Sequence, residues 1–301
     1  MYVGRQQLCI REVQDYMGLM RRLIVSLALF LWTTTFTNAV PAEEQPLWEA
    51  GIGATGLTMP DYRGSNQQRF YAFPLPYLVY RGDFLKVDKE GIYGMLFQSE
   101  RVRLSISAGG GVPVKSSNNT ARTGMPDLNP TLQIGPSLDV CLIENCNSDI
   151  VVRFRLPVRG VIAIATDLSQ FQGIGFVINP QLNIDINNVW LGRGWDVGFV
   201  VGPLFATEEY HDYYYGVAEE FAVPGFRSAY RTRGGYSGSQ LLVSVSKRFE
   251  HFWFGAFASY DELSGAVFDN SPLMRTRQSF MAGIGLAWIF AESNTKVRSS
   301  Q

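Results

Sequence analysis

The sequence has few of the residues from which metal sites, haem sites and nucleic-acid interfaces are built. Among 301 residues there are two histidines and three cysteines, and 26 basic residues nearly balance 27 acidic ones. No cysteine or histidine spacing matches a zinc or haem site, and a general nucleic-acid binder would carry a basic surplus. Past residue 42 no run reaches the roughly 18 apolar residues of a transmembrane helix. With 13% aromatic residues and 30 glycines, the composition favours an all-β fold, and no cofactor is expected.

The first 42 residues predict a secretory leader. Arg21 and Arg22 precede the apolar run 23–32, and small residues follow up to Ala42. A basic segment, a short apolar run and a small-residue cleavage site are the three parts of a signal peptide. Residues 1–16 are unlike any such basic segment, and we interpret them as an extension upstream of the true start. The mature protein is expected to be exported and to begin after Ala42, with cleavage after Ala39 as the alternative.

Beyond the leader the hydrophobic pattern has a period of two. In the segment 149–159, Ile150 and Phe154 fall on one face, and Arg153 and Arg155 fall on the other. Strict alternation over this length indicates a β-strand with two unlike faces. Such segments run to about 10–14 residues, near the roughly 9–11 that a tilted strand needs to cross a bilayer. Because backbone groups in lipid must be satisfied internally, the pattern predicts a closed transmembrane β-barrel.

Twelve strands are expected, which predicts an antiparallel up-and-down barrel with both chain ends on the periplasmic side. Short connections face the periplasm in such barrels and long ones face outward. The segment 84–97 is short for two strands, so a ten-stranded barrel with this segment as a flap is the alternative. The expected strands are 47–57, 69–80, 84–88, 91–97, 101–113, 131–142, 149–163, 173–186, 193–206, 238–248, 252–261 and 279–290.

The last expected strand carries the most specific local signal. Apolar and aromatic side chains occupy every second position up to an aromatic end residue, which resembles the signal read by the outer-membrane barrel assembly machinery. The residues assigned to this signal are Phe280, Ile284, Leu286, Trp288 and Phe290. The barrel is therefore expected to span 43–290 in the outer membrane of a Gram-negative cell, in contact with its lipid, and 291–301 to form a polar tail.

Short motifs lie between the expected strands, where alternation does not require them. They include Pro60-Asp61-Tyr62-Arg63-Gly64-Ser65, Gly124-Met125-Pro126-Asp127-Leu128, Tyr213-Tyr214-Tyr215-Gly216-Val217, Arg227-Ser228-Ala229-Tyr230 and Ser271-Pro272-Leu273. In this order and spacing they resemble the MipA/OmpV family of MltA-interacting outer-membrane proteins over essentially all of 47–290. The resemblance implies a scaffold that joins a murein lytic transglycosylase to a bifunctional murein synthase. A small-solute channel and an adhesive barrel that uses the 207–237 loop are the alternatives.

Catalysis has little support in the sequence. His211 and Asp212 precede a tyrosine run in the longest loop, where a surface hydrolase site is conceivable. A hydrolase needs a base that is oriented by a second group and lies close to a nucleophile, and nothing in the sequence fixes such partners. His251 lies in a short turn and is expected to be solvated. We therefore expect no enzyme activity.

Cys141 and Cys146 are the two cysteines left after the leader, and they flank a predicted periplasmic turn. The strand ends of a tight hairpin lie near the Cα separation that a disulfide needs. An exported protein also meets an oxidising compartment, in which a close pair can bond. A hairpin disulfide is expected here, and two free thiols are the alternative.

Charged residues on the inner faces of neighbouring strands are expected to meet in the lumen. Arg153, Arg155 and Arg159 lie on one strand, flanked by the strands that carry Asp139 and Asp185. Because unpaired charge in a narrow lumen is costly, we expect cross-strand ion pairs that partly plug the interior. The alternative is a selective channel in which the arginine row attracts anions.

Overall fold

The computed structural model describes residues 44–88, 91–144, 146, 148–189 and 194–298. The leader expected over 1–42 and the last three residues of the expected tail lie outside them.

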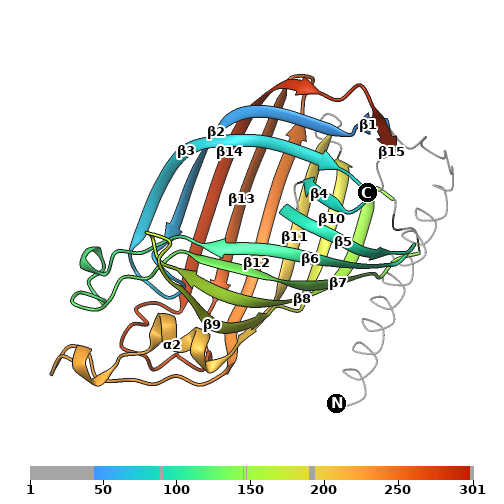
Figure 1. Ribbon diagram of the computed structural model, residues 1–301. Coiled ribbons are helices and arrows are strands. Elements are labelled where there is room, and N and C mark those ends of the chain that lie inside the picture. The colour runs from blue at the N-terminus through green and yellow to red at the C-terminus, as the bar shows by residue number, and fades with distance from the viewer. Residues whose placement is uncertain (1–43, 89–90, 145, 147, 190–193, 299–301) are drawn as a thin grey trace, which may run out of the picture. The chain divides into compact units, whose positions relative to one another are not determined.

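The described strands form a barrel in which each strand is antiparallel to its neighbours and the last one returns to the first (Figure 1). The strands are β2 (Trp48–Pro60), β3 (Gln68–Arg81), β4 (Leu85–Asp88), β5 (Gly91–Gln98), β6 (Val102–Gly111), β7 (Thr131–Cys141), β8 (Ile150–Ile164), β9 (Phe171–Ile178), β10 (Gln181–Val189), β11 (Trp195–Ala206), β12 (Gly235–Arg248), β13 (Phe252–Glu262) and β14 (Gln278–Glu292). β14 pairs with β2 from Ala282↔Thr58 to Glu292↔Glu49, which closes the sheet.

β9 and β10 share one position in the wall. β8 pairs with both, through Val158↔Ile178 before the interruption and Arg155↔Gln181 after it. Pro180 lies between the two strands, and a proline has no N–H to donate to a ladder. The strand expected over 173–186 is therefore divided at this point. With β9 and β10 counted as one, the described wall has twelve strand positions, and the prediction of twelve strands is confirmed.

The segment 84–97 belongs to the wall and is not a flap. β4 pairs with β3 through Tyr80↔Val87 and Arg81↔Lys86, and β5 continues the sheet to β6. The ten-stranded alternative is therefore wrong. The ladder between β3 and β4 is nevertheless short, because β4 itself has only four residues.

The two faces of the wall differ as alternation predicts. On β14, Ile284, Leu286 and Trp288 are each more than half exposed, whereas Ala287 and Ile289 are buried on the inner side. The apolar face thus points outward, where the lipid of a membrane covers it and the polar solvent does not.

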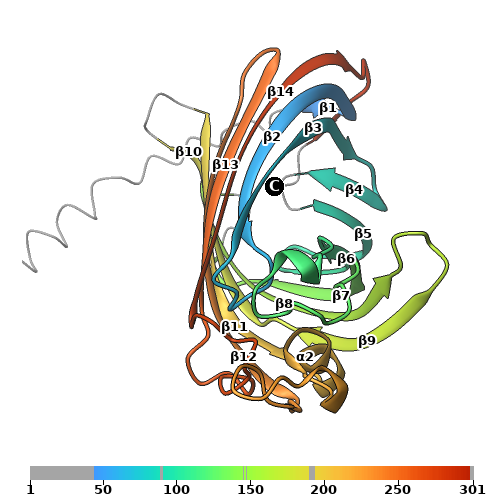
Figure 2. The same cartoon turned by 90° about the vertical axis from the view of Figure 1, so that its left-hand side faces the viewer.

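The long connections between strands pack together at one end of the barrel, which Figure 2 views end-on. We call this end the lid; it comprises residues 61–67, 112–130, 207–234 and 263–277. The lid contains the 3-10 turns η1 (Ser116–Asn118) and η2 (Glu219–Phe221) and the helix α2 (Glu208–Tyr215). Among the described residues no helix has the length and apolar character to cross a membrane.

The lid has a hydrophobic core of its own. All four of its connections contribute buried residues to this core, including Tyr62, Leu128, Tyr215, Phe268 and Leu273. The rings of Tyr215 and Phe268 stack with centroids 3.7 Å apart. Close packing of this kind holds the loops in one arrangement.

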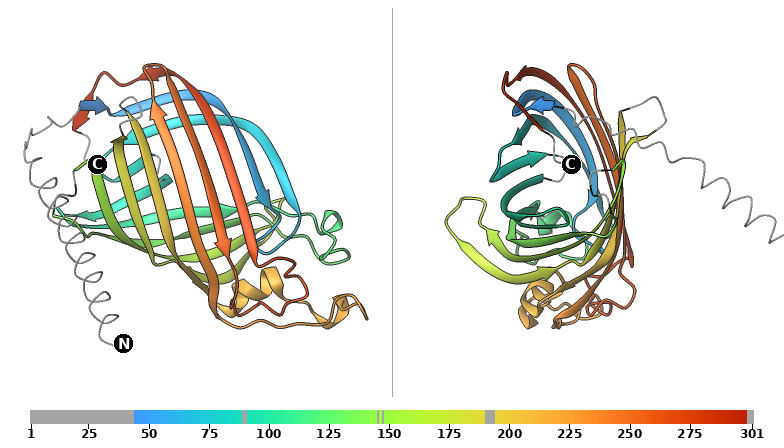
Figure 3. Two further views of the ribbon diagram at one scale, coloured as in Figure 1. Left: turned by 180° about the vertical axis from the view of Figure 1, so that it is seen from behind. Right: turned by 90° about the vertical axis from the view of Figure 1, so that its right-hand side faces the viewer.

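The described chain ends meet at the opposite end of the barrel, which we call the rim. It comprises these chain ends and the described residues of the turns 82–84, 99–101, 142–149 and 249–251. There β1 (Glu44–Pro46) pairs antiparallel with β15 (Lys296–Arg298) (Figure 3). β14 reaches Glu292, and β15 adds a strand within the segment 291–301 that was expected to form a polar tail. The short turns and the chain ends share the rim, which is the arrangement of the periplasmic side in such barrels.

Candidate functional site

A row of charges crosses three strands on the inner face of the wall. The register places Arg103 of β6 opposite Asp139 of β7, and Asp139 opposite Arg155 of β8. Both guanidinium groups bind the one carboxylate, at 2.8 Å from Arg103 and 3.0 Å from Arg155. Asp139 is almost fully buried. Charge-assisted bonds in so dry a position are strong, and they tie the register of the three strands together.

A second ion pair joins β8 to β10. The Nη1 atom of Arg153 lies 2.8 Å from a carboxylate oxygen of Asp185. The two acids that the sequence singled out therefore bind two of the three predicted arginines, together with Arg103. Arg103 was not among the predicted lumen charges, although it occupies the polar face of the alternating segment 101–113.

Arg159 differs from these arginines. Its Nε donates a hydrogen bond to the Ser107 hydroxyl at 3.0 Å, and no carboxylate of the described residues forms an ion pair with it. The expectation of an ion pair is thus wrong for this residue. The reason is its register: Arg159 lies opposite Val177 on β9, and its Cα lies beside Gly135 on β7. Neither neighbour supplies a charge, so the lumen carries a cation without a matching acid.

A buried carboxylate fixes the rim. Glu49 of β2 is 2% exposed and binds Arg81 of β3 at 2.8 Å and Arg248 of β12 at 3.0 Å. Arg248 also lies 3.4 Å from Glu292 of β14. These residues come from both ends of the chain, which is why sequence reasoning missed the cluster. It links strands that are not neighbours in the wall, since β13 and β14 lie between β12 and β2.

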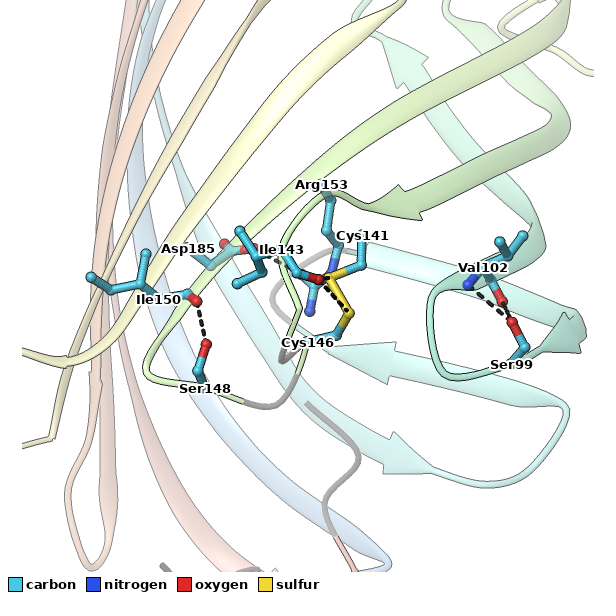
Figure 4. The surroundings of a disulfide bond; sticks show 9 residues. All are labelled: Ser99, Val102, Cys141, Ile143, Cys146, Ser148, Ile150, Arg153 and Asp185. Carbon is cyan, nitrogen blue, oxygen red and sulfur yellow. Dashed lines mark hydrogen bonds and ion pairs between the residues drawn. A yellow bond between two sulfur atoms is a disulfide. The ribbon is translucent and has the colours of Figure 1, made fainter. Parts of the chain in front are cut away.

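The connection between β7 and β8 is closed covalently at the rim. Cys141 and Cys146 form a disulfide with their Cα atoms 6.1 Å apart (Figure 4). Cys141 lies opposite Arg153 in the ladder, so the bond lies next to the Arg153–Asp185 ion pair. This crosslink and the Glu49 cluster make the rim a fixed surface.

The short motifs between the strands contribute side chains that hold the lid together. The Tyr62 hydroxyl donates to the Leu273 carbonyl at 2.8 Å, and burial raises the pKa of Tyr62 to about 12, so it remains a donor. Arg227 donates to the carbonyls of Ala121 and Phe221, each at 2.8 Å. These bonds join segments that lie far apart in the sequence. The motifs are therefore explained by the packing of the lid.

His211 belongs to the same packing. It is fully buried in α2, with Nδ1 2.7 Å from the Arg233 carbonyl and Nε2 in contact with the Ser237 hydroxyl. The carbonyl can only accept, so Nδ1 carries the proton and Nε2 accepts from Ser237. Burial lowers the pKa of His211, and Ser237 is itself 1% exposed. The enclosed pair joins α2 to β12.

The other predicted positions lie on surfaces. His251 is exposed, 3.8 Å from Glu250. The five residues assigned to the assembly signal are each at least half exposed on the outer face of β14: Phe280, Ile284, Leu286, Trp288 and Phe290. Among the described residues, no group of three or more side chains comes together that could hold a metal ion.

A closed antiparallel barrel with an apolar outer face, long connections at one end and both described chain ends at the other defines an outer-membrane β-barrel protein. The model of the family described as MltA-interacting protein MipA matches residues 52–290 of the chain. The chain belongs to the MipA family. The predicted family, the barrel fold and the outer-membrane location are thereby confirmed.

Individual relatives are distant. The "Putative outer membrane protein YiaT" of Escherichia coli K12 is 23% identical over 273 residues, which is 86% of this chain and 96% of that protein. The protein of the same name from Escherichia coli O157:H7 gives the same figures. Among solved structures, a bacterial polysaccharide outer membrane secretin has a TM-score of 0.40 and 8% identity, covering 81% of this chain and 99% of its own. A Pseudomonas aeruginosa FadL homologue has a TM-score of 0.30 and 9% identity, covering 72% and 60%.

Proposed function

We propose that this protein is a scaffold that joins a murein lytic transglycosylase to a murein synthase at the periplasmic side of the outer membrane. The family description names an interaction with MltA. In this chain, the observation that carries the proposal is the fixed rim.

The rim is held by three independent devices. The Cys141–Cys146 disulfide closes one turn, the Glu49 cluster binds strands from both sides of the closing seam, and β1 pairs with β15. A surface that is already ordered loses little conformational entropy when a partner binds. These devices therefore favour a docking role for the periplasmic end.

A small-solute channel is the second candidate, and Arg159 is the observation that favours it. A cation without a matching acid inside a pore attracts anions, whereas the ion pairs of Asp139 and Asp185 narrow the same lumen. The test is conductance in planar bilayers. A steady, anion-selective conductance that is lost in the Arg159→Gln variant would favour the channel function over the scaffold function.

The scaffold is tested by site-specific photo-crosslinking in intact cell envelopes. A photoreactive amino acid replaces Glu100 or Glu144, which are exposed in rim turns, and the matched controls carry it at Glu219 or Glu220 in the lid. We expect crosslinks to a lytic transglycosylase or a murein synthase from the rim positions alone, identified by mass spectrometry. Capture of neither enzyme from either rim position would exclude the scaffold, and capture of foreign surface proteins from the lid positions would favour adhesion.

A further inference from the structure

The described wall is incompletely paired at the seam between β3 and β6. On the side away from β2, only Tyr80 and Arg81 of β3 pair with β4, and the described residues 68–79 pair with β2 alone. Across the seam, β6 pairs with β5 no further than Ser107, so its residues 108–111 pair with β7 alone. Figure 1 shows β4 and β5 as short arrows that end before the lid end of β3 and β6. We call the unpaired side of β3 the open edge.

The open edge has lost hydrogen-bond donors at its centre. The backbone N–H of Arg81 donates to Leu47, so odd-numbered residues of this regular ladder direct their N–H groups toward β2 and even-numbered residues direct theirs to the open edge. Pro74 and Pro76 are even-numbered and have no N–H. A further strand cannot complete a ladder against such an edge. The occupant of the seam is therefore not a β-strand from a partner or from a second copy.

The carbonyl groups of the open edge remain. In hydrocarbon an unsatisfied backbone carbonyl is costly, so water or a polar part of a bound molecule has to reach these groups. The seam is thus a place where a polar group or water must reach the backbone at the depth of the membrane.

Between Arg69, which binds Asp61 at the lid end, and Arg81, which binds Glu49 at the rim, the inner face of β3 is apolar, unlike the usual polar lumen of such barrels. Leu75 and Tyr77 of β3 and Trp253 and Phe257 of β13 lie on this face, and the ring centroids of Tyr77 and Trp253 are 5.9 Å apart. We call these four residues the aromatic strip.

Glycines form the floor of the aromatic strip. A Cβ atom added at Gly283 would lie 2.5 Å from the ring of Phe257, and one at Gly285 would lie 3.5 Å from Trp253 and 3.7 Å from Leu75. The ring of Phe257 therefore occupies the space that a side chain at position 283 would fill, whereas Trp253 and Leu75 lie in ordinary contact range of Gly285. The aromatic strip and the glycines of β14 together form an apolar surface that faces the lumen.

Arg159 lies on the other side of the seam. Its Nε binds Ser107, the last residue of β6 that pairs with β5, and its Nη1 lies 3.7 Å from a Cβ built on Gly109. The cation without a matching acid is therefore next to the unpaired part of β6. An apolar strip on one side of the seam and a cation on the other complement a molecule with an apolar body and one anionic group.

We propose that the seam between β3 and β6 admits an anionic amphiphile from the membrane into the lumen. Its apolar chain lies along the aromatic strip and its anionic group binds Arg159. A long-chain carboxylate and a single-chain phospholipid share this chemistry, and the experiment separates them.

The test uses the full-length mature protein, refolded in detergent, with three diazirine-bearing C16 probes. These are palmitate, a lysophosphatidate and, as the neutral control, hexadecanol. We expect one or both anionic probes to label residues of the aromatic strip or the inner face of β3, at least tenfold more efficiently than hexadecanol. Labelling by palmitate alone identifies a carboxylate ligand, and labelling by the lysophosphatidate alone identifies a phosphate.

Matched variants show whether the named residues are responsible. Arg159→Gln is expected to weaken binding of the preferred probe about tenfold, and Arg159→Lys to restore most of it. Phe257→Ser is expected to weaken binding several-fold, whereas Phe252→Ser, on the outer face of the same strand, is not. The heat-dependent shift in gel mobility that folded barrels show confirms that each variant is folded. Labels confined to the outer apolar face, or equal labelling of Arg159→Gln and the unchanged protein, would overturn the proposal.

Discussion

Two parts of the barrel fill their inner faces with different kinds of side chain. The charged wall, made of β6, β7, β8 and β10, fills its inner face with arginines and aspartates that bind each other across the strands. The aromatic wall, made of β13, β14, β2 and β3, fills its inner face with rings that lie on glycines. Both walls have the same period of two and the same apolar outer face. The inward-facing side chains therefore differ from strand to strand, although the outward-facing side chains that meet the lipid are apolar in both walls.

Different substitutions should destabilise the two walls. The charged wall depends on a partner being present, because a buried ion left alone is destabilising. The aromatic wall depends on a side chain being absent, because Gly283 leaves room for the ring of Phe257. Substitutions that remove a charge or add a methyl group separate the two.

The largest effect is expected from Asp139→Asn. This change leaves Arg103 and Arg155 without the carboxylate they share and should lower the free energy of unfolding by about 3–5 kcal/mol. Urea unfolding from lipid vesicles, followed by tryptophan fluorescence, measures the change. Glu144→Gln at the exposed rim is the matched control and should leave the midpoint unchanged. Equal midpoints for both variants would show that the charged wall does not depend on its ion pairs.

A smaller loss is expected from Gly283→Ala in the aromatic wall. The added methyl group collides with the ring of Phe257, and overpacking of this kind costs about 1–3 kcal/mol. Gly173→Ala on β9 is the control, because a Cβ there has no heavy atom within 4 Å. The same unfolding measurement applies to both. If the two variants lose equal stability, the glycines do not act as a floor.

The open edge distinguishes the aromatic wall in another way. Replacing Pro74 and Pro76 together by threonine restores two N–H groups at this edge, and exposed edges with free donors promote association. We expect the dimer fraction in detergent to rise several-fold, measured by size-exclusion chromatography with light scattering. Threonines at Ala72 and Leu78 change the same edge without adding donors and should leave the protein monomeric. A monomer in both cases would mean that the prolines do not keep the edge open.

The smallest effect concerns the lid, where a titratable group is buried. Because burial lowers the pKa of His211, the unfolded segment takes up a proton first as the pH falls. The stability of the lid is therefore unaffected above the usual histidine value of about 6.5 and declines below it.

Hydrogen exchange between pH 7.5 and 5.5 measures this decline. Protection factors of residues 207–234 should fall up to about tenfold at the lower pH, while β13 and β14 serve as an internal reference. His211→Gln should abolish the pH dependence and His251→Gln should preserve it. The opposite pattern would assign the effect to His251.

The sequence predicts the outer face of this barrel better than its inner face. Alternation alone places the strands within a few residues and assigns Arg153, Arg155 and Arg159 to the same side. It does not contain the register between strands, and register decides that Asp139 meets Arg155 while Arg159 faces Val177. A one-residue shift would exchange the two faces of a strand, so the partners follow only from the closed structure.

The contacts within the lid and the Glu49 cluster at the rim could not be predicted from the sequence. The packing of Tyr62, Tyr215 and Leu273 has no periodicity, since it joins loops from distant parts of the chain. The Glu49 cluster likewise exists only because β14 closes on β2. The weak segment 84–97 was visible in the sequence, but its meaning was not: the short β4 leaves β3 with an open edge.

The disulfide between β7 and β8 also bears on how the barrel is made. Its cysteines are five positions apart, so the bond can form in an isolated hairpin, before any other strand is in place. The compartment that an exported chain first enters is oxidising. This hairpin can therefore reach the membrane with its alignment already set by chemistry, as a ready-made piece to which later strands are added.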